Sequence, residues 1–122
     1  MNLVKRYKPG KIISVHAPLT LLDYDGPGDN GEIASSKSLL ANQLLIRMSM
    51  KAKGYRIKNY PFYVGSLGNW AGNERNIPTF TLELPTIDYT KHKKYWKRFQ
   101  GAIHFAIKSD VLKPISFESD QL

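Results

Sequence analysis

Three histidines are the first side chains in this sequence to test for metal chemistry: His16, His92 and His104. His92 and His104 fall on one expected helix, twelve positions apart, which separates them by about 18 Å along the helix axis. At that separation they cannot share a metal ion. Cysteine is absent, no His-Glu-x-x-His occurs, and no histidine has a carboxylate three residues later. The recognisable patterns therefore do not build a complete zinc site.

His16 differs from the other two histidines in its local sequence. It follows Ile12-Ile13-Ser14-Val15, a short β-branched run that is typical of a buried strand, and it precedes Ala17-Pro18. Catalytic groups in open α/β sheets gather at the C-terminal ends of strands, where the loops form a crevice. The alternative is a histidine that bonds a backbone group of the loop, and the residues alone leave both open.

Glu83 is a second candidate for chemistry. The run Thr79–Leu84 alternates as a strand does and places Phe80, Leu82 and Leu84 on one face, with Glu83 on the other. A half-buried carboxylate at a strand end can exchange protons with a metal-bound water. The competing interpretation is a glutamate on the solvent-facing side of an exposed strand.

Two segments of the sequence carry a family resemblance. The residues Ser14-Val15-His16-Ala17-Pro18-Leu19, continuing through Leu22-Asp23-Tyr24-Asp25-Gly26-Pro27, form the first segment. The second runs from Gly65 to Pro78 and is followed by Thr81-Leu82-Glu83-Leu84-Pro85. In this order they resemble the third-ligand and catalytic-glutamate segments of the bacterial zinc carboxypeptidases. The similar branch comprises murein peptide amidases and succinylglutamate desuccinylase-like enzymes.

The resemblance implies roles for individual residues. His16 would be a zinc ligand, and Glu83 would be the general base that activates a zinc-bound water and the acid that protonates the leaving amine. A substrate-binding tyrosine would be Tyr60 or Tyr63, with Tyr60 preferred on spacing, although either could be an ordinary core aromatic. The implied activity is hydrolysis of an amide bond in a peptide, with cell-wall (murein) peptides as the candidate substrate.

The sequence departs from the family pattern in one large respect. The first two zinc ligands of the family, in a His-x-x-Glu motif, lie upstream of the position that corresponds to Met1. We therefore expect residues 1–122 to be one partial carboxypeptidase-like domain, inactive alone, which forms an oligomer or pairs with a complementing N-terminal half. A non-catalytic homologue that acts as a binding module is the alternative, and a basic nucleic-acid-binding domain is a weaker one.

The elements that must position these residues alternate between helix and strand. Apolar periodicity and turn signals predict an α/β fold, which by the resemblance is the C-terminal half of the carboxypeptidase mixed sheet flanked by helices. The long helix near the C-terminus is expected to turn Trp96, Phe99, Ile103 and either Ala106 or Ile107 inward. Besides the two strands above, the pattern predicts helices at 3–8, 35–53 and 90–108, and a turn-rich loop at 23–31. It also predicts a short helix that is capped by Ser66 and runs through residues 70–74.

Composition narrows the class of protein further. Hydrophobic residues make up 42% and charged residues 23%, as in ordinary globular domains. The formal net charge is +8, but the basic residues are spread along the chain, so a solvated surface explains them and no nucleic-acid partner is expected. The longest apolar runs are too short to cross a bilayer, and the lack of cysteine fits a reducing compartment, so we expect a cytoplasmic protein without a membrane partner.

Overall fold

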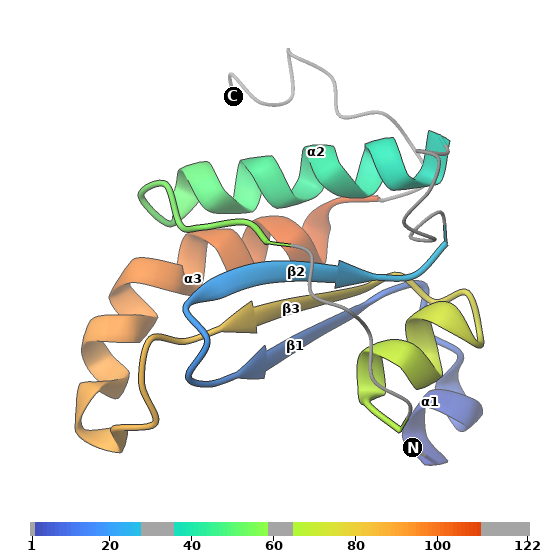
Figure 1. Ribbon diagram of the computed structural model, residues 1–122, viewed down its shortest axis with the longest axis horizontal. Helices are drawn as coiled ribbons and strands as arrows, with labels where there is room; N and C mark the ends of the chain where they lie inside the picture. The colour runs from blue at the N-terminus through green and yellow to red at the C-terminus, as the bar shows by residue number, and fades with distance from the viewer. Residues whose placement is uncertain (1, 28–35, 59–64, 111–122) are drawn as a thin grey trace.

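A three-stranded sheet forms the centre of the molecule, with the strands in the order β1-β3-β2 (Figure 1). β1 (Ile12–His16) runs parallel to β3 (Thr79–Glu83), and β2 (Leu21–Asp25) runs antiparallel to β3. The mixed α/β class predicted from the sequence is confirmed. The computed structural model describes residues 2–27, 36–58 and 65–110.

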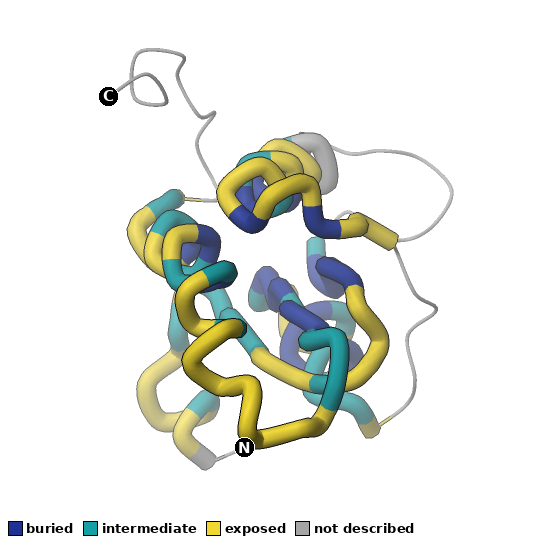
Figure 2. The backbone as a smooth tube through the Cα atoms, turned by 90° about the vertical axis from the view of Figure 1, so that its left-hand side faces the viewer, coloured by how far each residue is buried: buried dark blue, intermediate teal, exposed yellow. Residues whose placement is uncertain are grey.

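Two long helices cover one face of this sheet. α2 (Ser36–Lys51) and α3 (His92–Lys108) lie side by side over it, and their buried residues face the strands (Figures 1 and 2). Phe80 and Leu82 are fully buried on the helix-covered side of β3, as the alternation predicts. The remaining core residues come from β2, α2, α3 and the turn between α2 and β3: Leu22, Tyr24, Ala41, Leu44, Leu45, Met48, Ala52, Tyr55, Phe99, Ala102 and Ala106.

The inward face of α3 differs from the prediction at one position. Phe99 is buried and Ile103 packs against the core, but the Trp96 side chain is 52% exposed. Ala102 and Ala106 share the buried face with Phe99, which centres that face away from Trp96. The two alanines and Phe99 occupy the centre of the buried face, so the tryptophan is left on the flank of the helix.

The predicted loop at 23–31 is partly wrong, because residues 21–25 form β2. Aspartates and glycines in this stretch signal a turn, yet Leu22 and Tyr24 alternate with Asp23 and Asp25 as a strand does. Antiparallel pairing with β3 and burial of the two apolar residues outweigh the poor strand propensity of aspartate.

Shorter helical elements complete the described structure. α1 (Asn2–Tyr7) precedes β1, and a 3₁₀ turn, η2 (Tyr89–Lys91), precedes α3. A π-helical turn, η1 (Gly68–Asn73), packs beside β2 and β3, and the Ser66 hydroxyl accepts a hydrogen bond from Asn69 N at 3.1 Å, which fits the predicted cap. Within the described residues no helix combines the length and the apolarity that a membrane span requires.

Candidate functional site

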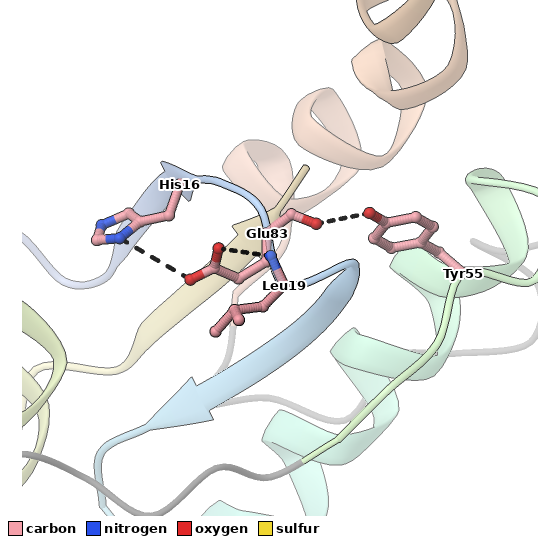
Figure 3. A network of polar contacts seen from close by, with 4 residues as sticks. All are labelled: His16, Leu19, Tyr55 and Glu83. Carbon is pink, nitrogen blue, oxygen red and sulfur yellow. Dashed lines mark hydrogen bonds and ion pairs between the residues drawn. The ribbon is translucent and has the colours of Figure 1, made fainter. Parts of the chain in front are cut away.

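The strand register brings His16 and Glu83 together. The two residues are direct partners in the parallel β1–β3 pair, each at the C-terminal end of its strand. Because partners in a sheet project to the same face, their side chains point the same way, and His16 Nδ1 lies 3.9 Å from Glu83 Oε1 (Figure 3). Two positions that are far apart in the sequence therefore lie side by side at the C-terminal ends of two neighbouring strands.

The connection between β1 and β2 encloses Glu83. These strands lie on either side of β3, so residues 17–20 must cross the end of β3, a span of about 10 Å across two strand spacings. Leu19 N points back at the carboxylate and donates to Glu83 Oε2 at 3.4 Å (Figure 3). The Glu83 side chain is only 11% exposed, whereas the His16 side chain is 54% exposed. The carboxylate is thus held under the loop, and the imidazole remains open to solvent.

Tyr55 fixes the backbone of the same strand end from the helix-covered side. Its hydroxyl donates to the carbonyl oxygen of Glu83 at 2.6 Å, and its ring packs edge-on against Phe99 with centroids 4.7 Å apart. Burial raises the pKa of the Tyr55 hydroxyl, and the nearby Arg98 guanidinium opposes that shift. The sequence did not single out Tyr55, because nothing local marks the tyrosine that reaches a distant carbonyl.

An open depression of about 430 Å³ lies beside His16, between the end of β1 and the start of α3. Its polar lining includes His16, His92, Thr86 and Tyr95, and Thr86 Oγ1 and the Tyr95 hydroxyl lie 2.8 Å apart. The sequence alone gives His92 no metal partner, because it cannot share a metal with His104. The fold instead places it in the same depression as His16, where its Nδ1 lies 2.8 Å from Tyr89 O.

Of the four predicted site residues, the structure describes two and brings them together. Tyr60 and Tyr63 lie outside the described residues. His104 sits on the flank of α3, where its ring meets Trp96 edge-on at 5.7 Å between centroids.

The donor set at this site is one imidazole and one carboxylate. A catalytic zinc site uses three protein ligands, and the described part of the chain contains no group of three or more His, Cys, Asp or Glu side chains suited to a metal. The described residues do not fit a catalytic zinc ion by themselves. What the pair offers unaided is an imidazole and a carboxylate that face each other across 3.9 Å, and both are side-chain types that act as general acids and bases.

A scan against protein-family models finds no match, and a search of curated proteins finds no similar sequence.

Proposed function

We propose that this chain carries the proton-transfer residues of a zinc-carboxypeptidase-like hydrolase that cleaves an amide bond in a peptide. One observation supports the proposal most directly: His16 and Glu83 are in-register partners at parallel strand ends, with 3.9 Å between Nδ1 and Oε1. The family resemblance assigns chemistry to the same two residues. Murein peptides are the substrate class to which that resemblance points, and a cytoplasmic location belongs to the same proposal.

Glu83 is the acid–base group in this proposal. Its carboxylate takes a proton from the attacking water as the water oxygen bonds to the amide carbon. The resulting carboxylic acid then gives that proton to the nitrogen as the carbon–nitrogen bond breaks, which yields a carboxylic acid and an amine. The enclosure of Glu83 under residues 17–20 holds the carboxylate in one orientation, which such a transfer requires.

His16 is the proposed metal ligand, and zinc is the proposed metal. Its exposed imidazole leaves room for an ion on the open side of the pair. Zinc binding requires protein donors in addition to this pair, since catalytic sites use three. His92 shares the depression with His16 and is the first residue to test as a further donor.

A non-catalytic binding module is the second candidate function. The contact from Leu19 N to Glu83 Oε2 gives the carboxylate a structural task, because it ties the 17–20 connection to the end of β3. In that case the pair shapes the wall of the depression for a ligand that is bound and released unchanged.

Metal content and amide hydrolysis distinguish the two candidates. The purified chain and the variants His16→Ala, Glu83→Gln and His104→Ala are each mixed with a carboxypeptidase N-terminal half that carries the His-x-x-Glu ligands. Each mixture is analysed for zinc and assayed on short peptides and a murein tripeptide. The hydrolase proposal expects zinc that is lost in His16→Ala and kept in His104→Ala. It also expects Glu83→Gln to retain the metal while kcat falls by roughly 10²–10⁴-fold.

Each result has a defined meaning. Zinc that His16→Ala leaves unchanged, or hydrolysis that Glu83→Gln leaves unchanged, contradicts the hydrolase assignment. A wild-type chain that shows neither zinc nor hydrolysis in this mixture supports the binding module. Circular dichroism of each variant separates the loss of a function from the loss of the fold.

A further inference from the structure

β1 lies at the edge of the sheet and has hydrogen-bonding groups on its outer side. On the inner side, Ile12 N donates to Pro78 O at 2.8 Å, and His16 O accepts from Leu84 N at 2.8 Å. Backbone groups alternate along a strand, so those of Ile13 and Val15 point away from β3. Within residues 2–27, 36–58 and 65–110, no hydrogen bond to these outward groups occurs.

The sequence of β1 lacks the features that usually protect an edge. Natural edge strands carry lysine, proline, a bulge or an inward charge that prevents pairing with another chain. Ile12–His16 contains no lysine, arginine, aspartate, glutamate or proline, although the whole chain has 18 lysines and arginines. A second copy carries the same net charge of +8, and this uncharged strand is a place where two copies can approach with little repulsion.

The flank of α3 extends the same surface. Arg98 and Phe105 lie on the side of α3 that faces α2, where Arg98 Nε donates to a carbonyl after α2 and a lysine of α2 lies over the Phe105 ring. Helical geometry places Trp96, Ile103 and Ile107 on the opposite flank, away from α2. Trp96 is 52% and Ile107 is 58% exposed. The outer edge of β1 therefore lies beside a flank of α3 with exposed apolar side chains. Lys11, which precedes β1, donates from Nζ to the carbonyls of Ile107 and Ser109 at one end of this surface.

We propose that this surface binds a second copy of the chain, with the two β1 strands paired antiparallel about a two-fold axis at Ser14. This register sets Ile13 opposite Val15 of the second copy, and Val15 opposite Ile13. Both residues have outward backbone groups, so each such pair exchanges both of its N–H···O bonds. A register shifted by one residue would set outward groups against inward ones and lose these bonds.

The same register also places the apolar side chains of both β1 strands on the same face of the joined sheet. Ile13 and Val15 project to the helix-covered face in both copies, which brings the two α3 flanks together and covers exposed apolar surface of Trp96 and Ile107. On the face of the sheet away from the helices, Ser14 lies opposite Ser14 of the second copy, and His16 lies opposite Ile12 of the second copy. The interface is isologous, as in most dimers with two-fold symmetry.

The first test is the oligomeric state. Sedimentation equilibrium or light scattering of the full chain is expected to give twice the chain's mass of 13.9 kDa. Val15→Lys, which places a charge beside the axis, is expected to weaken dimerisation at least about tenfold. Ile46→Lys on α2 is the matched control, because Val15 and Ile46 are both 51% exposed, and it should leave the dimer intact. A monomeric wild type, or equal dimerisation of the two variants, overturns the proposal.

The second test determines the register of the two paired β1 strands by disulfide cross-linking. The chain has no cysteine, so Ser14→Cys introduces one thiol per copy, at a directly opposed pair whose Cα atoms are about 4.5 Å apart, within disulfide range. Mild oxidation should cross-link this variant efficiently. Gln43→Cys, on the exposed side of α2, should remain uncross-linked at the same protein concentration. A dimer in which Ser14→Cys cross-links no better than Gln43→Cys refutes pairing about Ser14.

Discussion

Substitution of Tyr55 by phenylalanine tests whether the Tyr55 hydroxyl anchors the strand end that carries Glu83. The variant keeps the ring, and with it the edge contact to Phe99 at 4.7 Å. It removes the hydroxyl, which donates to Glu83 O and also interacts with the Thr20 side chain. The Glu83 carbonyl also points toward β2, where Glu83 pairs with Leu21 in the antiparallel sheet. It therefore remains within the sheet hydrogen bonding when the tyrosine hydroxyl is removed. The loss therefore stays near the net value of one hydrogen bond, about 1 kcal/mol.

Urea unfolding at one fixed protein concentration measures this loss. The free energy of unfolding of Tyr55→Phe should be lower by about 1 kcal/mol, and its melting temperature should be lower by about 4 °C for a chain of this size. Tyr7→Phe is the matched control, because Tyr7 is 67% exposed, and its change should stay within about 0.5 kcal/mol. Equal midpoints for Tyr55→Phe and wild type would refute the anchoring role.

The pH dependence gives an independent check on Tyr55. Burial raises the pKa of its hydroxyl above the usual 10.0, so the unfolded chain releases this proton at a lower pH than the folded chain does. The stability that wild type holds over Tyr55→Phe should be complete below pH 10.0 and should disappear as the pH rises through the folded-state pKa. An advantage that grows above pH 10.0 would contradict this sign.

Three further substitutions test the local packing and the helix start. Gly72→Ala would force a Cβ into overlap with the Asp25 carbonyl oxygen, so it should destabilise the fold and lower the melting temperature markedly. Gly101→Ala on the exposed side of α3 meets no atom within 4 Å and should stabilise the protein by about 0.5–1 kcal/mol in urea unfolding. Asp88→Ala removes the side-chain acceptor for Thr90 N, so it should lower the melting temperature at neutral pH. Hydrogen bonds from Thr90 lower the pKa of the Asp88 carboxyl, so wild type should lose this advantage as the pH falls below 3.8. A melting-temperature difference for Asp88→Ala that persists unchanged at the lowest pH would exclude the cap as its cause.

The fold was predictable where apolar residues recur with a regular period. The alternation around Phe80 and Leu82 predicted β3, and the three-and-four spacing of Leu44, Leu45 and Met48 predicted α2. Such patterns arise because each helix or strand buries the apolar side chains of one face, whichever element that face packs against. β2 was not predicted because its strand conformation depends on pairing with β3. The local sequence around β2 contains no signal of that pairing.

The candidate site shows the same division. The sequence by itself determined which side chains end the strands, so His16 and Glu83 could be named as candidates from their local surroundings alone. Only the tertiary structure decided that the two strands are adjacent, parallel and in a register that makes these residues partners. It also decided that the 17–20 connection encloses Glu83 and that Tyr55 holds its carbonyl. These facts depend on contacts between segments distant in the chain, which packing of the whole core selects and no local pattern encodes.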